Sequence, residues 1–305
     1  MTRTRAVDRR VVACIPHFQC KAHIRQAVDS LLQQTHRDLT IVVANDGDRD
    51  PPWDELASIR DLRLVRFELK QNHGPFFATS VVLHASAAPY LLIQDADDWS
   101  DPERVSLLLA ALERDQSDFA VSAQCLYVES GGSRHLSGVR WTESSMASSP
   151  ERFVVNPCLT SEYYYRVPHH GMFCSRALRN VSAYYAGLRL SYDRLLTNLM
   201  LMTGRVSHIP VPLYHRLIRA ESITHSPGTR WNSEIGRHEF EIGRRFYGLC
   251  FEQYQEYVAG RLSSSALLSF IRKTAKRHVV AADRSELRSE VKRLKALLVE
   301  GQSTK

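Results

Sequence analysis

The sequence predicts an α/β fold with a parallel sheet, followed by a helical C-terminal extension. Short apolar runs alternate with helix-periodic segments over the first 115 residues, and the pattern is helical from about residue 232 onward. Alternating strands and helices build a parallel sheet with helices on both faces. We therefore expect one domain over 1–230, with halves at 1–115 and 116–230, and an extension over 231–305.

The first half opens with a strand, a helix and a second strand. "RRVVACIP", residues 9–16, is a β-branched run ended by a proline, which is typical of a buried strand. The next strand lies in "DLTIVVANDGD", residues 38–48, and stops at the turn signal Asp46-Gly47. A helix over 21–34 is predicted between them by the helical spacing of Ile24, Ala27, Val28, Leu31 and Leu32.

Four further elements complete this half. They are a weak strand over 62–69, a helix over 76–87 after the Gly74-Pro75 turn, a strand at 90–94 and a helix at about 102–115. In such sheets ligands bind beyond the carboxyl ends of the strands. Asp46 and the acids that follow residue 94 are predicted to lie at that edge.

The second half has a weaker pattern. Its predicted elements are a strand at 119–130, a turn at 131–138, a polar loop at 141–151, a strand entering a helix at 171–181, a helix at 192–204 ended by Gly204, and a strand at 205–217.

The C-terminal segment carries most of the chain's net positive charge. The net charge is +7, and residues 272–295 hold nine Lys or Arg against three acids. We interpret this run as a solvated helix face, with weak contact to an anionic membrane surface as the open alternative and no nucleic-acid partner. Apolar residues at heptad-like spacing predict docking on the domain or on a second subunit as a homodimer: Leu287, Val291, Leu294 and Leu298.

Composition places the chain among ordinary globular proteins, with 44% hydrophobic and 24% charged residues. No run approaches the ~18 apolar residues of a membrane span, and a full signal-peptide region is absent, which predicts a cytoplasmic protein. The six cysteines are scattered without a CxxC pair. We expect reduced core thiols in place of a disulfide framework or a zinc site.

Crowded acids follow the strand at 90–94. In "LLIQDADDWSDPER", residues 91–104, Asp95 and Asp97 are expected to share one strand face, where two carboxylates repel unless a cation joins them. Mn²⁺ or Mg²⁺ suits such oxygen ligands together with a substrate's phosphates. A purely structural role, capping the helix that begins near Pro102, explains Asp101 but not the other two.

These segments resemble the family 2 glycosyltransferases, which have the GT-A fold. "VVACIPHFQCKAHIRQAVDSLLQQTHRDLTIVVANDGD" is similar to the family's opening strand, helix and Asp-Asp-Gly-Ser-like turn, and "DADDWSDPER" to its metal-binding segment. The resemblance covers about residues 10–225. It implies a Rossmann-like nucleotide-binding sheet merged with an acceptor-side half.

The resemblance also implies roles for residues of the first half. Pro16 and His17 would border the nucleotide, Asp46 would bond the nucleobase, and Asp95 would face the sugar or ribose, with Ala96 beside it. Asp97, with Asp95, would hold the metal, and Asp98 would help to orient them. Two departures stand out: Asn45 replaces the first acid of the family's pair, and "ATS" at 78–80 replaces its usual Ala-Arg-Asn.

In the second half, "GLRLSYDRLLTNLMLMTGRVSHIPVPLYHRLIRAESIT" resembles the segment in which an acid opens a helix. That acid is Asp193, which would be the catalytic base, although the family often has Glu-Asp where this chain has Tyr192-Asp193. Weaker candidates are His170 of "PHHGMFC" and two cations suited to a diphosphate, Arg216 and His225, with Arg219 nearby.

The function that follows is metal-dependent, inverting transfer from a nucleoside diphosphate sugar of UDP, dTDP or GDP type to a small-molecule, peptide or glycan acceptor. A nucleotidyltransferase is one alternative, but "PHFQCKAH" lacks the glycines of a phosphate loop. A sugar-nucleotide-binding protein without transferase activity is the other. Competing motifs such as GxGxxG, HExxH or GxSxG do not occur.

Overall fold

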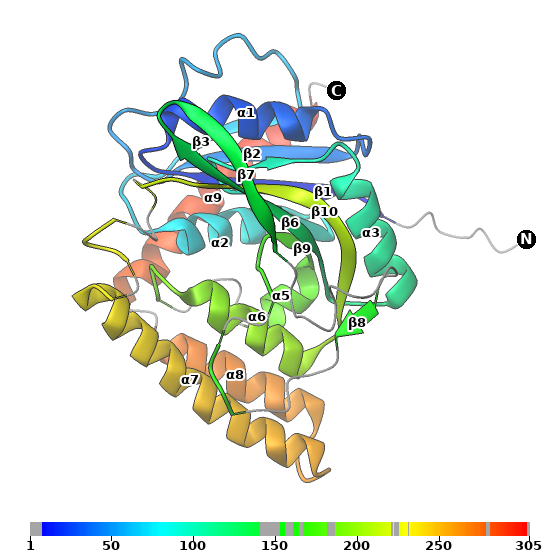
Figure 1. Cartoon of the computed structure of the whole chain (residues 1–305). Helices are drawn as coiled ribbons and strands as arrows, with labels where there is room; N and C mark the ends of the chain where they lie inside the picture. Colours follow the sequence, from blue (N-terminus) through cyan, green and yellow to red (C-terminus); the bar gives the residue numbers. More distant parts are fainter. Residues whose placement is uncertain are drawn as a thin grey trace, which may run out of the picture.

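One mixed sheet runs through the molecule, with helices on both of its faces (Figure 1). The structure is a computed structural model that describes residues 8–140, 153–155, 161–164, 167–181, 187–220, 222, 226–230, 232–278 and 281–303. The strands are β1 (Val11–His17), β2 (Leu39–Asn45), β3 (Leu64–Glu68), β4 (Tyr90–Ile93), β5 (Trp99–Ser100), β6 (Phe119–Ser130), β7 (Ser133–Arg140), β8 (Phe153–Val155), β9 (Gly171–Cys174) and β10 (Val206–Ile218).

The strand order brings two distant parts of the chain together. It is β3-β2-β1-β4-β9-β6-β10-β5, with β7 paired to β6 and β8 to β10. Strands β1 to β4 are parallel, so His17, Asn45 and Ile93 end at one edge of the sheet. Strand β9 lies antiparallel between β4 and β6. The residues just before β9 therefore lie at the same edge as the residues just after β4.

Helices cover the sheet in uneven layers. They are α1 (Lys21–Leu32), α2 (Pro75–Ala85), α3 (Arg104–Asp115), α5 (Ser175–Val181), α6 (Tyr192–Thr203), α7 (Glu234–Val258), α8 (Ser264–His278) and α9 (Ala281–Ser303). Helices α1 and α3 cover one face; α2, α5, α6 and α9 lie on the other, with α7 and α8 outside them (Figure 1).

Alternate side chains of the buried strand β1 contribute to the two hydrophobic cores on opposite faces of the sheet. Val12 and Cys14 enter the larger core with α2, α6 and the C-terminal helices, whereas Ala13 and Ile15 enter the smaller core under α1 and α3. Successive side chains on a strand point to opposite faces, so a strand covered on both sides reads as a continuous apolar run. This confirms the interpretation of "VVACI" as a fully buried strand.

The C-terminal helices share the larger core, which explains the apolar stripe in the last segment. Leu294 is fully buried, and Leu287, Val291 and Leu298 pack against that core. Helix α9 lies along α2, and Glu286 contacts His73 just before α2. The stripe is therefore used within the chain, as the docking alternative predicted. The division at residues 115 and 230 stays a prediction.

One predicted element is wrong. Residues 131–138 were expected to form a turn, but only Gly131 and Gly132 turn, with φ of +57° and +77°, and Ser133–Arg140 continues as β7. Most of its side chains are polar, and its two apolar residues, Leu136 and Val139, are exposed. No apolar alternation therefore marks the strand, and backbone pairing with β6 defines it. The polar loop predicted at 141–151 lies outside the described residues.

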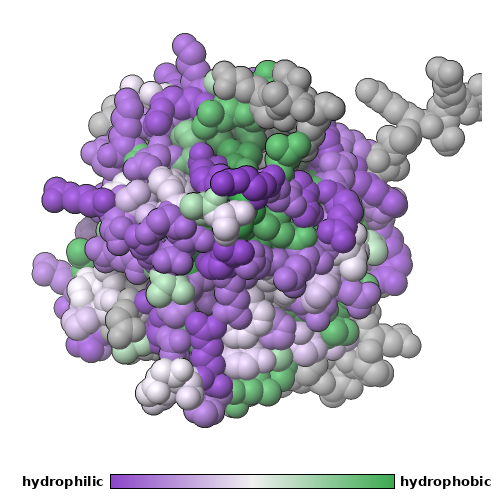
Figure 2. Space-filling view, turned by 90° about the horizontal axis from the view of Figure 1, so that it is seen from above, coloured by the Kyte–Doolittle hydropathy of each residue, from purple (hydrophilic) through white to green (hydrophobic). Residues whose placement is uncertain are grey.

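The remaining features are the hydropathy of one face, the state of the cysteines and the length and polarity of the helices. Figure 2 shows that hydrophilic residues dominate the face above α1, with hydrophobic residues gathered near its middle. Five of the six cysteines lie in the described segments, where they are free thiols and four of them are buried; Cys158 lies outside those segments. No helix in the described part of the chain combines the length and apolar character needed to cross a bilayer.

Candidate active site

A turn after β4 brings three carboxylates together. Oxygen atoms of Asp95, Asp97 and Asp98 lie within 4.8 Å of one another. The predicted convergence is present, but its cause differs from the expectation. Strand β4 ends at Ile93, and the amide of Asp98 donates to the carbonyl of Asp95, so a turn gathers the acids in place of strand alternation.

Asp98 is built into the protein. The residue is 2% exposed, one carboxylate oxygen accepts the amide of Leu217 at 2.7 Å, and the hydroxyl of Tyr214 also bonds it. Burial, then the neighbouring Asp97 and Asp95, raise the pKa of Asp98 well above its usual range. Asp98 thus ties the turn to β10, and its role in orienting a metal site stays a prediction.

Asp97 faces a guanidinium. Its Oδ2 accepts from Arg219 Nε at 2.7 Å, and the same guanidinium reaches Cys20 Sγ at 3.2 Å. Burial and the charge of Asp95 raise the pKa of Asp97 despite this partner. Arg219, which follows β10, thereby places a cation beside the turn.

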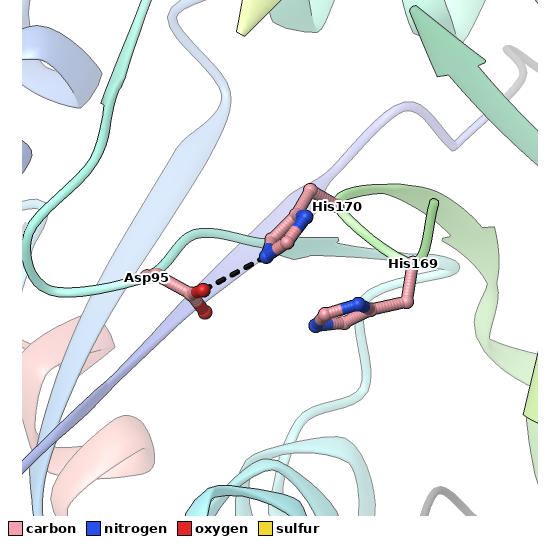
Figure 3. A group of neighbouring side chains, drawn as sticks. All are labelled: Asp95, His169 and His170. Carbon is pink, nitrogen blue, oxygen red and sulfur yellow. Dashed lines mark hydrogen bonds and ion pairs between the residues drawn. The ribbon is translucent and has the colours of Figure 1, made fainter. Parts of the chain in front are cut away.

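Asp95 faces the segment before β9. Its Oδ2 lies 2.8 Å from His170 Nε2, as the dashed line in Figure 3 shows, while His170 Nδ1 lies 3.3 Å from the Gln124 amide. Burial holds the pKa of His170 well below its usual range, so this contact is a hydrogen bond that a neutral ring donates to the carboxylate. His170 stacks on Tyr214, with ring centroids 4.8 Å apart.

His169 lies beside His170 and extends the group toward α6. The two ring centroids are 3.9 Å apart, and both rings point to the side of Asp95 (Figure 3). His169 Nδ1 is 3.6 Å from Asp193 Oδ2. Burial, with His170 next to it, lowers the pKa of His169 to about 3, so a neutral ring faces the carboxylate and no ion pair forms.

Asp193 stands in the first turn of α6, as the sequence predicts for the base. Its side chain is 27% exposed, more than that of the neighbouring His169. Phe76 at the start of α2 contacts both sides of this corner, with its ring 6.4 Å from that of His169 and 5.4 Å from that of Tyr192. The structure therefore places Asp193 and Asp95 on either side of the two histidines.

A buried arginine holds the acidic turn through hydrogen bonds on the core side. Arg104 at the start of α3 is fully buried and donates to the Gln94 side chain at 2.9 Å, to Ser100 Oγ at 2.8 Å and to the Ile93 carbonyl at 3.0 Å. Its guanidinium lies 4.4 Å from the centre of the Tyr214 ring. Burial lowers the pKa of Arg104 to about 10, which leaves it charged at neutral pH.

The turn after β2 forms the second corner of the site. Asp46 is 2% exposed, and its two oxygens accept the amides of His73 at 3.0 Å and Gly74 at 2.7 Å. Burial raises the pKa of its carboxyl despite these bonds. Asp46 thus anchors the start of α2, and its contact with a nucleobase stays a prediction. Gly47 has φ of +69°, and a Cβ there would lie 2.4 Å from the carbonyl carbon of Gln71.

His17 and Asn45 are paired next to that turn. His17 Nδ1 lies 3.0 Å from Asn45 Oδ1, and Asn45 donates to the Asp48 carbonyl at 3.1 Å. Burial lowers the pKa of His17. The Asn45 side chain, which replaces the family's first acid, therefore has a structural partner. Pro16 precedes His17 on β1 and is half-buried.

The remaining candidates are placed unevenly. Arg216 on β10 is half-buried, and its positive charge helps to lower the pKa of His170. Ala96 is buried within the turn. His225 lies outside the described residues.

Four residues of this site were absent from the candidates drawn from the sequence: His169, Gln124, Tyr214 and Arg104. Each contacts a partner more than five positions away, so local pattern carries little signal for them. A fully buried Arg inside "DPERVSLLL" is the one irregularity that could have pointed to a supported turn, because a charge on a core-facing helix position needs partners.

Among the residues that the structure describes, two groups of donors fit a divalent cation. They are Asp95 with Asp97 and Asp98, and Asp95 with His169 and His170. Carboxylate oxygens suit Mg²⁺ and Mn²⁺, and neutral imidazoles add affinity for Mn²⁺ and later transition metals. The residues present therefore fit the metal that the fold family implies.

Comparisons with known proteins show the family of the chain. The model of the family described as Glycosyl transferase family 2 matches residues 12–181 of the chain. Glycosyltransferase GlyA of Streptococcus pneumoniae is 29% identical over 128 residues, which cover 41% of this chain and 18% of that protein. Chondroitin synthase of Pasteurella multocida is 23% identical over 209 residues, 68% of this chain and 20% of that protein. The chain thus spans about a fifth of the length of these two relatives.

Solved structures share the fold over nearly the whole chain. TarS of S. aureus, residues 1–349 in complex with UDP, superposes with a TM-score of 0.56 at 18% identity and covers 94% of this chain and 91% of that one. The complex of the same protein with UDP-GlcNAc gives a TM-score of 0.56 at 16% identity, covering 94% and 92%. The predicted GT-A architecture with C-terminal helices is confirmed, and the chain belongs to glycosyl transferase family 2.

Proposed function

We propose that the chain transfers a sugar from a nucleoside diphosphate sugar to an acceptor nucleophile, with inversion at the anomeric carbon and with the help of a divalent cation. One observation carries the proposal. The acidic turn at 95–98 and Asp193 meet at the carboxyl edge of the parallel strands, joined through His169 and His170. Ligands of open α/β sheets bind at this edge.

The chemistry assigned to the chain's own residues is a single displacement. Asp193 takes the proton from the acceptor hydroxyl, whose oxygen attacks the anomeric carbon while the bond from that carbon to the diphosphate oxygen breaks. The nucleoside diphosphate leaves with the bonding electron pair. A cation bound at the acidic turn, Mn²⁺ or Mg²⁺, supplies charge neutralisation for that leaving group. Asp95 belongs to both groups of possible metal ligands at the turn. The resemblance to the family adds Asp97 as the second acid that would hold the ion.

Arg219 and Arg216 support the leaving group in this proposal. Arg219 already pairs with a carboxylate at 2.7 Å, in the geometry that it would use toward a phosphate oxygen. Asp46 and His17 mark the nucleotide side of the edge, where the base is expected.

The donor that we propose is a UDP-sugar, since the TarS structures hold UDP and UDP-GlcNAc; dTDP and GDP sugars are the alternatives. The acceptor is a small molecule, a peptide or a glycan. A cytoplasmic location, weak membrane-surface contact through the basic helices α8 and α9, and a homodimer remain predictions from the sequence.

The test is a thermal-shift panel of UDP, dTDP, GDP and their sugars, with and without Mn²⁺. Stabilisation follows RT ln(1 + [L]/Kd), so a ligand at 100 times its Kd adds about 2.7 kcal/mol. We expect UDP compounds to raise the unfolding temperature, and more so with Mn²⁺. No shift with any member contradicts the proposal, and binding without Mn²⁺-dependent donor hydrolysis favours the binding-protein alternative.

A further inference from the structure

The two donor groups at the acidic turn make different predictions about the metal. One offers only carboxylates, whereas the other offers Asp95, His169 and His170, whose ligand atoms all lie within 4.8 Å of one another. We propose that a Mn²⁺ ion binds to Asp95 together with His169 and His170, as a mixed nitrogen and oxygen site. This deepens the proposed function, on which it rests for the role of the ion.

The carboxylate-only group already has partners inside the protein. Asp97 bonds the Arg219 guanidinium at 2.7 Å, and Asp98 accepts an amide and a hydroxyl from β10. A cation between these acids would lie beside the positive charge of Arg219, which repels it. Asp95 is the accessible acid of the three, with 39% of its side chain exposed against 16% for Asp97.

The imidazole of His170 is held in position for Asp95. Tyr214 stacks on the ring at 4.8 Å, and the hydroxyl of the same tyrosine accepts the backbone amide of Asp95 at 3.1 Å. One side chain thus positions two of the three proposed ligands. Burial of the ring favours neutral imidazole, which is the form that coordinates metals.

Gln124 supplies the outer contact that such a ligand needs. It lies 3.3 Å from His170 Nδ1, and its carboxamide can face that nitrogen with either its oxygen or its nitrogen. In the present orientation the oxygen is buried and has no hydrogen-bond partner among the described residues. With the oxygen facing Nδ1, the neutral ring carries its proton on Nδ1 in place of Nε2, and the Nε2 lone pair is then available to a metal ion beside Asp95 Oδ2.

In that tautomer Nε2 and Oδ2 are both acceptors, and they could not keep the 2.8 Å separation that they have as a hydrogen-bonded pair. Two acceptors at this distance repel each other unless a proton or a cation lies between them. A metal ion that draws the two atoms apart satisfies both. Metal-bound histidines commonly donate their second ring N–H to such an oxygen, which fixes the tautomer.

The backbone makes the position of the histidines specific. Gly171 follows them, and a Cβ at this glycine would lie 2.3 Å from the carbonyl oxygen of Ala120 on β6. The missing side chain lets β9 approach β6 closely. The pair of histidines is thereby held at the end of β9, next to β4 and its acidic turn.

The donor set also predicts which ion binds. Mg²⁺ prefers oxygen ligands in an octahedron and keeps several waters, whereas imidazole nitrogen suits Mn²⁺ and the later divalent metals. We therefore expect the metal-stripped full chain to bind one Mn²⁺ more tightly than Mg²⁺, even without nucleotide.

The experiment is pulsed EPR of Mn²⁺ added to the EDTA-treated full chain, with free Mn²⁺ measured by continuous-wave EPR. We expect ¹⁴N modulation from directly bound imidazole in the native chain. His169→Asn and His170→Asn should each weaken Mn²⁺ binding by at least 10–100-fold, the loss caused by removing an outer-shell partner alone. The double variant should lose the ¹⁴N signal.

The control is His278→Asn, a half-buried histidine that stacks on Phe246 at 5.4 Å in the C-terminal helices. It should keep both the ¹⁴N signal and the affinity. Mn²⁺ binding without ¹⁴N modulation in the native chain overturns the mixed site but leaves the proposed function intact, and loss of binding in Asp97→Asn would then assign a carboxylate-only site. No Mn²⁺ binding, with or without UDP, overturns both. The native-chain spectrum decides the matter even if a variant fails to fold.

Discussion

The proposed nucleotide side and the proposed acceptor side of the site are held in different ways. On the nucleotide side, Asp46, Asp97 and Asp98 each accept hydrogen bonds from the chain itself, and Arg104 braces the acidic turn from the core. On the acceptor side, Asp193 is more exposed and faces a neutral ring 3.6 Å away. The polar groups of the proposed nucleotide side therefore contribute to folding in addition to any contact with the donor, whereas the more exposed Asp193 is the residue that we propose to act in the reaction.

The largest expected effect tests the acceptor side. Asp193→Asn should lower turnover by ~10²–10⁴-fold, the usual worth of a general base, because the amide cannot take the proton. Donor affinity and thermal stability should stay as in the native chain. Release of UDP from UDP-GlcNAc with Mn²⁺ present measures the rate, and calorimetric titration with UDP measures binding. Full activity of this variant would remove Asp193 from the role of base.

The second effect belongs to the nucleotide side and should appear as lost stability. Arg104→Met removes the buried guanidinium and leaves the Ile93 carbonyl and the Gln94 side chain without that donor. Removing one member of a buried charged network costs about 3–5 kcal/mol. Urea unfolding measures the loss. Arg114→Met, at an exposed position of the same helix, is the matched control and should change the free energy of unfolding by less than ~1 kcal/mol.

The contrast also explains what the sequence predicts well. Strands β1, β2 and β4 and helices α1 to α3 were predicted because they are covered by two cores, which imposes apolar runs and helical spacing on them. The motif residues proposed for the nucleotide side follow those strands directly, which is why local pattern singles them out. Strand β7 was missed because it pairs only with β6 and keeps a polar, exposed surface.

The two histidines show why the other contacts of the site could not be predicted from the sequence. His170 meets Asp95 across 75 positions of sequence, through the strand order β4-β9-β6. No local period encodes that order. Only "HHG", a polar pair followed by the glycine that lets β9 approach β6, marked the place, and its weight depends on a contact that sequence pattern does not contain.

A third effect tests whether the turn after β2 needs its glycine. Gly47→Ala places a Cβ 2.4 Å from the Gln71 carbonyl carbon at a φ of +69°, so the turn must shift. We expect a loss of about 1–3 kcal/mol in the free energy of unfolding and weaker UDP binding, since Asp46 moves with the turn. Gly138→Ala on β7, where nothing lies within 4 Å, is the control and should be nearly neutral. Equal behaviour of the two variants would contradict the tight turn.

The smallest effect asks how far the nucleotide side extends into the C-terminal helices. Glu286 on α9 lies 3.0 Å from His73 Nε2 and accepts from Gln71 at 2.6 Å, next to the amides that bond Asp46. Glu286→Gln should cost at most ~1 kcal/mol, because the pair is near the surface and the amide retains one acceptor oxygen. Glu241→Gln, which loses an exposed pair with Arg244, is the matched control and should be close to neutral. Urea unfolding and UDP titration give the two readouts. If Glu286→Gln weakened UDP binding tenfold while Glu241→Gln did not, helix α9 would belong to the nucleotide side of the site, and the boundary predicted at residue 230 would separate parts that act together.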